Sequence, residues 1–224
     1  GSEMCIRDSY LRAEIIVIAL AMLRFGRNDP DQTRLGIMLI LATIPVIIAG
    51  YIVNYANWHW LDMIYSLAIA NLVFAVILWF ADKVPAARRD LGQISWRHAL
   101  IVGIAQIFAL IPGASRSGVT MSAARFLGYE RVTAARFSLL LSLPTIAGAG
   151  LLKTLDLVKS SDATLGADAL IVAVLSAGLA WFAIRWMMRW FATAGFGIFV
   201  YYRLALGGLL LLAIAQGWVA PSIS

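Results

Sequence analysis

The chain has 224 residues, of which 62% are hydrophobic and only 13% are charged, and its formal net charge is +6. Soluble domains contain about 45–50% apolar and about 25% charged residues, so this composition excludes a soluble globular protein and a disordered chain. The single cysteine excludes a disulfide scaffold and a cysteine-ligated metal site. We therefore expect an all-α polytopic membrane protein.

The first nine residues, 1–9, differ in character from the sequence that follows. They have neither the basic start and apolar centre of a signal peptide nor an amphipathic pattern. They resemble the translation of a sequencing adaptor, which predicts that Cys5 is foreign, that native sequence starts near Tyr10 and that a natural N-terminal segment is missing. A genuine short tail is the alternative. The next apolar stretch, residues 11–23, is short for a membrane span, which fits a truncation.

Six apolar segments approach the length of about 20 residues that a helix needs to cross about 30 Å of hydrocarbon. They occupy residues 11–23, 35–54, 63–80, 132–152, 165–184 and 198–216. Because the loops between them are short, residues 10–224 are predicted to form a single integral membrane domain.

Residues 98–128 are also apolar but are interrupted at 112–118, so each half, of about 13 and 9 residues, is too short to span. If this segment is a re-entrant hairpin, the cytoplasmic loops hold 12 Lys and Arg residues and the outer loops hold 2. If it crosses once, the split becomes 9 against 5. The positive-inside rule therefore favours the hairpin. The cytoplasmic loops are then residues 24–34, 81–97, 125–136 and 185–197. Anionic lipid accounts for their basic charge, so we expect no nucleic acid partner.

Three predicted crossings precede the hairpin and three follow it, in opposite orientations. This arrangement is typical of an inverted repeat in which each unit is one hairpin plus three helices. The second repeat then covers residues 98–216, and an incomplete first repeat covers residues 10–80. The hairpin of the first repeat is expected in the missing N-terminal segment. No sequence similarity between the two halves supports this repeat.

The interruption contains residue types that suit an anion site. Pro112 ends the first half because it lacks an amide hydrogen, while Gly113 and Gly118 permit close approach of the backbone. The second half begins with backbone amides and with a guanidinium that matches two phosphate oxygens, which predicts a phosphate or diphosphate site. Its polar side chains are Ser115, Arg116, Ser117 and Thr120. The alternatives are that either serine is a plain helix cap and that the arginine snorkels from a shallow tip.

Polar residues elsewhere have simpler interpretations. No Asp, Glu or Cys lies between His98 and Leu127, so a general base or a carboxylate ligand must come from another segment. We expect His59 and His98 at the membrane interface. Asn71 is expected to bond between helices, and Arg203 is expected to snorkel to the cytoplasmic boundary.

The run from Gln106 to Thr120, QIFALIPGASRSGVT, resembles the second signature of the undecaprenyl-diphosphate phosphatase family, the bacitracin-resistance proteins. Residues 43–45, 135–144 and 199–203 resemble further segments of that family, so the resemblance covers nearly everything from about Tyr10 onward. Members of the family are integral inner-membrane enzymes that remove the terminal phosphate of undecaprenyl diphosphate. They regenerate the lipid carrier for peptidoglycan and other envelope polymers.

The resemblance implies a role for each motif residue. Catalytic roles are implied for Arg116, Ser115, Ser117 and Thr120, and substrate-binding roles for Gly113, Gly118 and Gln106. The implied partners are a polyprenyl diphosphate lipid and membrane lipids, and the active site is expected to open to the periplasmic side. The family's first signature, which contains Glu, Ser and His, should precede Tyr10. Carboxylate ligands for a divalent cation, Mg²⁺ or Ca²⁺, are therefore expected in the missing segment, and we expect the chain as given to be inactive alone.

Two other classes of function remain. A secondary transporter or a lipid-phosphate flippase also combines broken helices with an anion site inside the membrane. A purely structural membrane subunit is the weaker alternative, because it gives no reason for Arg116 at an internal helix break. Phosphate release distinguishes the enzyme from a carrier.

Overall fold

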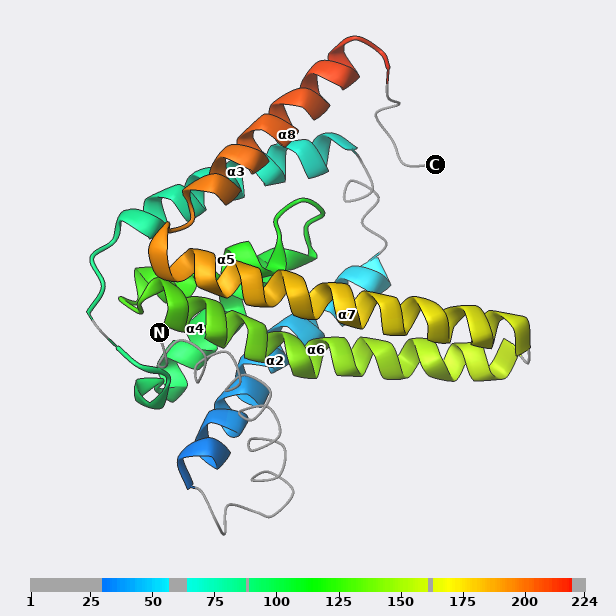
Figure 1. Cartoon of the computed structure of the whole chain (residues 1–224), viewed down its shortest axis with the longest axis horizontal. Helices are drawn as coiled ribbons and strands as arrows, with labels where there is room; N and C mark the ends of the chain where they lie inside the picture. The colour runs from blue at the N-terminus through cyan, green and yellow to red at the C-terminus, as the bar shows by residue number, and fades with distance from the viewer. Residues whose placement is uncertain (1–29, 57–63, 88, 161–162, 219–224) are drawn as a thin grey trace.

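The structure, a computed structural model, describes residues 30–56, 64–87, 89–160 and 163–218, and all regular structure in these ranges is helical (Figure 1). The α-helices of this part are α2 (Pro30–Ala56), α3 (Ile64–Lys83), α4 (Trp96–Gln106), α5 (Arg116–Phe126), α6 (Arg131–Ser160), α7 (Ala163–Thr193) and α8 (Gly197–Ala215). Two 3-10 turns, η2 (Leu91–Gln93) and η3 (Ile107–Leu110), precede and follow α4. The all-α prediction is confirmed for the described residues.

The predicted apolar segments after residue 30 are helical over nearly all of their described residues. Three of the described helices are long and apolar enough to cross a membrane, over Pro30–Val53, Ile64–Lys83 and Gly197–Ala215. The chain is thus a multi-pass membrane protein. Residues 1–9 and 11–23, on which the adaptor and truncation predictions rest, lie outside the described residues.

Helices α6 and α7 are longer than predicted, at 30 and 31 residues. The predicted loop at residues 153–164 contains no Gly or Pro, so helix continues through most of it. Helix α7 likewise continues through much of the predicted loop at residues 185–197. It ends at Thr193, just before Gly195, whose φ of 70° is a conformation that terminates helices.

Helix α5 lies between two buried clusters. One cluster joins α2, α4, α5 and α6, and Ala124 belongs to it. The other joins α3, α5, α6, α7 and α8, and Met121 belongs to it. Figure 1 shows α3 beside α8 and α6 beside α7, and both pairs are in contact. The second half of the predicted hairpin is therefore held on several sides.

Small residues allow close packing between helices. A Cβ at Gly103 would lie 2.4 Å from the carbonyl oxygen of Ala42, so only glycine lets α4 approach α2 this closely. A Cβ at Gly207 would lie 2.7 Å from the side chain of Leu72, where α8 meets α3. Close contact of this kind is the main source of helix association in lipid, where burial from water contributes little.

Helices α4 and α5 form the predicted hairpin. Each has 11 residues, or about 16 Å, which is about half of the hydrocarbon thickness. The two ends of the hairpin meet, because the Ala87 amide donates to the Gly128 carbonyl at 2.8 Å and Nδ1 of His98 lies 2.7 Å from the Tyr129 hydroxyl. Burial raises the pKa of the Tyr129 hydroxyl, which keeps it protonated in this contact. The first half ends earlier than predicted, in η3 before Pro112.

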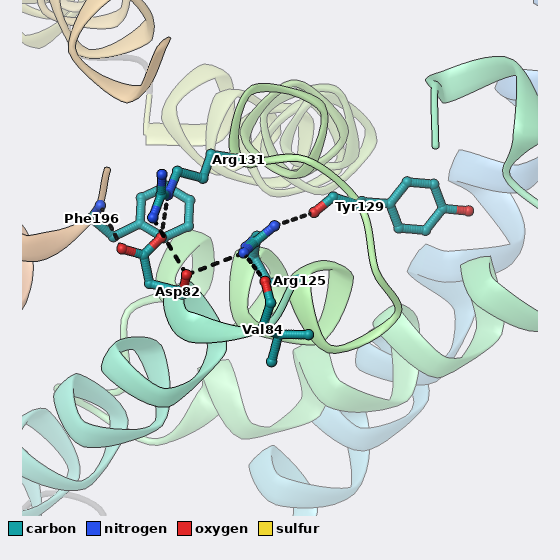
Figure 2. A network of polar contacts seen from close by, with 6 residues as sticks. All are labelled: Asp82, Val84, Arg125, Tyr129, Arg131 and Phe196. Carbon is teal, nitrogen blue, oxygen red and sulfur yellow. Dashed lines mark hydrogen bonds and ion pairs between the residues drawn. The ribbon is translucent and has the colours of Figure 1, made fainter. Parts of the chain in front are cut away.

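Figure 2 shows how the base of the hairpin is tied to its neighbours. The Asp82 carboxylate accepts from Nε of Arg131 at 2.5 Å and from the Phe196 amide at 3.3 Å. It thereby joins the end of α3 to the starts of α6 and α8.

The buried Arg125, at the end of α5, completes this base. It donates to the carbonyl of Tyr129 at 2.7 Å, to that of Asp82 at 3.1 Å and to that of Val84 (Figure 2). Nη2 of Arg34 reaches the Ile94 carbonyl at 3.4 Å. These bonds connect all four of the loops that the charge distribution predicted to be cytoplasmic.

Candidate functional site

The tip of the hairpin is a tight turn against α3. The Ile111 amide donates to the Phe108 carbonyl, and the Ala114 amide donates to the Ile111 carbonyl, both at 3.1 Å. Gly113 has a φ of 88°, and a Cβ there would lie 2.2 Å from the Leu67 carbonyl oxygen. Glycine is therefore required both by the backbone conformation and by the close approach to α3.

Ser115 caps α5 in a strained conformation. Its φ of 65° is positive, which in the described residues is otherwise confined to glycine. Its hydroxyl accepts from the Gly118 amide at 3.3 Å and lies 3.4 Å from the Ser117 hydroxyl. A strained non-glycine residue costs about 1–3 kcal/mol and is typical of functional turns. The cap leaves the amides of the first helical turn, at Arg116 and Ser117, without partners inside the helix.

Arg116 is half-buried and has a nearly unused guanidinium. Its one hydrogen bond to the described residues runs from Nη1 to the Ser142 carbonyl at 3.4 Å, near the limit for such a contact. No carboxylate in the described part of the chain pairs with it. Arg116 is also the first residue of α5, so its guanidinium and the free amides of the first turn belong to the same helix end, and both suit a phosphate group.

The predicted residues are only partly gathered at the tip. Ser115 and Ser117 are exposed beside Arg116. Thr120 is one turn further and only 1% exposed, and its hydroxyl lies 2.9 Å from the Arg116 carbonyl and 2.7 Å from the Ser138 hydroxyl. In this geometry Thr120 supports the start of α5 from the interior and does not point outward from the tip.

Gln106, at the end of α4, is fully buried, yet neither polar atom of its side chain has a hydrogen-bond partner in the described structure. Leaving a buried amide unpaired costs about 1–3 kcal/mol. This position therefore favours the arrival of a further polar group, which is consistent with the substrate-binding role that the resemblance implies.

The expectation for Arg203 was wrong. Arg203 does not snorkel to the boundary but is 7% exposed inside the molecule, and its Nη2 donates to the carbonyls of Gly113 at 2.6 Å and Ala114 at 3.0 Å. Its Nε donates to Oδ1 of Asn71 at 2.8 Å, which confirms that Asn71 bonds between helices. A charge within lipid needs polar partners, and the tip carbonyls supply them. The signal in the sequence was that residues 198–216 contain a single charge while 63–80 contain a central Asn.

The described residues do not fit a divalent cation. The tip offers guanidinium, amide and hydroxyl groups, which suit an anion. No group of three His, Cys, Asp or Glu side chains comes together within the described ranges. His98 lies at the base of the hairpin, and His59 falls outside the described residues.

Comparisons with known proteins agree with the motif. The family described as Bacitracin resistance protein BacA matches residues 8–209. An undecaprenyl-diphosphatase of Maricaulis maris is 44% identical over 209 residues, which cover 90% of this chain and 77% of that protein. Proteins of the same name from Alteromonas mediterranea and Teredinibacter turnerae are 38% and 42% identical, over 90% and 92% of this chain and 77% and 78% of their own lengths. The chain therefore belongs to the BacA family of bacitracin resistance proteins.

Proposed function

We propose that this protein hydrolyses undecaprenyl diphosphate to undecaprenyl phosphate and inorganic phosphate. The reaction recycles the lipid carrier for peptidoglycan synthesis and confers resistance to bacitracin. The observation that carries this proposal is that relatives named undecaprenyl-diphosphatase are 37–44% identical over about 90% of the chain. The geometry of the tip agrees, because its donors suit a diphosphate.

In this proposal, the described residues at the tip bind the diphosphate of the substrate. In the reaction, a water oxygen bonds to the terminal phosphorus and the bridging P–O bond breaks, so that the bonding electrons stay on the lipid phosphate and a proton is released. Negative charge moves toward the bridging oxygen, and fixed donors stabilise it without reorganising. The Arg116 fork is suited to two non-bridging oxygens, and the amides of the first turn of α5 are suited to the same phosphate.

The membrane arrangement belongs to the same proposal. It consists of six crossing helices and one re-entrant hairpin in the bacterial inner membrane, with the active site open to the periplasm. The second repeat of an inverted pair covers residues 98–216. The meeting of both hairpin ends and the contacts among the four basic loops support this arrangement. The polyprenyl chain then lies among membrane lipids while the diphosphate reaches the tip.

A divalent cation, Mg²⁺ or Ca²⁺, is proposed from the family resemblance alone. The ligands are expected in sequence that precedes Tyr10, because the tip has no carboxylate. The test compares residues 1–224 with the full-length product of the gene, with and without a chelator. We expect metal-dependent phosphate release by the full-length protein and little or none by residues 1–224. Equal metal-dependent release by both would contradict the proposal.

The function itself is tested with full-length protein in detergent. Phosphate release from undecaprenyl diphosphate is measured beside an Arg116→Ala variant. Arg97→Lys, an exposed change at the start of α4, is the control and should retain activity. A flippase or a secondary transporter would bind the lipid without releasing phosphate, so absence of release from well-folded protein would favour that alternative.

A further inference from the structure

Arg203 forms more hydrogen bonds than a contact between two helices requires, because it bonds both to α3 and to the tip of the hairpin. Its Nε donates to Oδ1 of Asn71 at 2.8 Å, and Nδ2 of Asn71 donates back to the Arg203 carbonyl at 2.7 Å. This reciprocal pair fixes the side chain between α3 and α8. The guanidinium is thereby held in one orientation, with its remaining N–H groups directed at the tip of the hairpin.

Nη2 of Arg203 holds two successive carbonyls of the tip, those of Gly113 and Ala114. In a trans peptide the C=O and the following N–H point in opposite directions. The Ser115 amide shares its peptide plane with the Ala114 carbonyl, so it points away from Arg203. By holding the carbonyls inward, Arg203 sets the direction of the backbone that leads into α5 and to Arg116.

Nη1 of Arg203 is buried without a hydrogen-bond partner, and no carboxylate in the described part of the chain pairs with this arginine. It lies next to Gly118, where an added Cβ would be only 2.7 Å from Nη1. Gly118 thus provides the space that this nitrogen occupies. An unneutralised cation at this place adds to the positive end of α5 and favours an anion at the tip.

We propose that Arg203 is a positioning residue for the diphosphate site: it orients the tip through the Gly113 and Ala114 carbonyls, and Gly118 is glycine in order to admit it. The proposal rests on the proposed function and adds a residue on the last helix to that site. Arg203 acts through the tip and its charge, while Arg116 contacts the phosphate.

The test is a double-mutant cycle of Arg203→Lys and Gly118→Ala in the full-length protein. Lysine keeps the charge but cannot hold Asn71 and both carbonyls together. Alanine at 118 displaces the guanidinium while Arg203 itself is retained. We expect each single variant to lower kcat/KM on the order of tenfold, mainly through KM. The double variant should be little worse than Arg203→Lys, because the added methyl group no longer has a guanidinium to displace.

Two further measurements separate positioning from general damage. Elution as a single species and thermal unfolding report the fold, with Arg97→Lys as the matched arginine control. The rise in unfolding temperature on adding inorganic diphosphate reports binding without turnover. We expect this rise in the parent and in Arg97→Lys, and a reduced rise in both tip variants.

The proposal would be overturned if folded Arg203→Lys protein stayed within about twofold of the parent in both kcat/KM and the rise in unfolding temperature. It would also be overturned if the losses of kcat/KM in the two single variants multiplied fully in the double variant. A parent protein whose unfolding temperature does not change on adding diphosphate would overturn it as well. Failure of the proposed function looks different. In that case the parent releases no phosphate from the lipid, yet diphosphate still stabilises it and the two variants still lose that effect.

Discussion

Two arginines at the tip meet the cost of charge within a membrane in different ways. Nε and Nη2 of Arg203 donate inward to Asn71 and to two carbonyls, whereas Arg116 has only one long contact within the described residues. A charge at membrane depth costs about 2.5–3.5 kcal/mol on insertion scales, so a half-satisfied arginine is expected where a ligand completes it. The contrast supports the proposed roles, which are phosphate binding for Arg116 and positioning of the tip for Arg203.

Arg116→Lys should be damaging although it preserves the charge. An ammonium cannot contact two phosphate oxygens in the planar manner of a guanidinium. The loss should be on the order of 1.5–3 kcal/mol, or roughly tenfold to a hundredfold in kcat/KM for undecaprenyl diphosphate. Steady-state phosphate release by the full-length protein measures it. If the variant keeps activity within about twofold, Arg116 is not a ligand of the substrate.

Two substitutions of Ser115 distinguish a role as helix cap from a role in catalysis. Ser115→Ala removes the cap, worth about 1 kcal/mol, and keeps a side chain at a positive φ. Ser115→Gly loses only a few tenths of a kcal/mol of capping and relieves the strain. Thermal unfolding should therefore rank the glycine variant at or above the parent and the alanine variant below it. If the hydroxyl is catalytic, as the resemblance implies, phosphate release falls in both variants. An active Ser115→Gly variant would show that the Ser115 side chain only caps α5.

The roles of some tip residues could be predicted from their own chemistry, whereas the roles of others depend on distant parts of the chain. Gly113 and Gly118 could be assigned to close backbone approach because glycine at a break has few other uses. The role of Arg203 could not be deduced, because its partners are 89 to 132 residues away in the sequence. The interior position of Thr120 likewise depends on Ser138, which belongs to a different helix.

At the scale of elements, the hairpin depends on its base as much as on its tip. Its two helices are each too short to span, and both ends are fixed by bonds to the segments before α4 and after α5. The apolar pattern and the break at 112–118 correctly predicted two short helices, and the re-entrant path of this segment through the membrane stays a prediction. Helix ends were predicted less well. Residues 153–164 were predicted to be a loop because they contain charged residues, but these residues are compatible with a helix.

Arg125→Met should destabilise the hairpin more than Arg131→Gln, which removes the nearby ion pair with Asp82. Arg125 is 3% exposed and serves three carbonyls, which methionine would leave without that donor, at a cost of about 3 kcal/mol or more. The Arg131 side chain is 43% exposed, so Arg131→Gln should cost about 1 kcal/mol or less. Half-lives at a fixed temperature in detergent give the ranking. Equal half-lives for the two variants would show that Arg125 does not hold the base.

At the scale of the whole molecule, the charge distribution and the contacts group the same four loops together by independent routes. The positive-inside rule grouped four loops on one face from composition alone. The structure joins these loops through Arg34, Asp82 and Arg125. The packing of α5 between two clusters could not be predicted, because both clusters combine helices that are distant in the sequence.

The orientation is testable with single cysteines in a Cys5→Ser background, which contains no other cysteine. A cysteine at Asn57 reports the loop before α3. Cysteines at Ala86 and Glu130 report the segments before and after the hairpin, and both of these residues are exposed. A membrane-impermeant maleimide should label Asn57→Cys from the periplasmic side, in spheroplasts. It should label Ala86→Cys and Glu130→Cys only in inverted vesicles, because a re-entrant hairpin returns the chain to the face that it left.

The Glu130→Cys variant decides between the two topologies that the sequence allows. A hairpin that crossed the membrane once would place residue 130 opposite residue 86 and would expose it in spheroplasts. That result would also conflict with the hydrogen bond from the Ala87 amide to the Gly128 carbonyl, since a bond of 2.8 Å cannot join two faces that lie about 30 Å apart. Labelling of Ala86→Cys and Glu130→Cys from the same face, opposite Asn57→Cys, is therefore the outcome that the contacts at the base of the hairpin require.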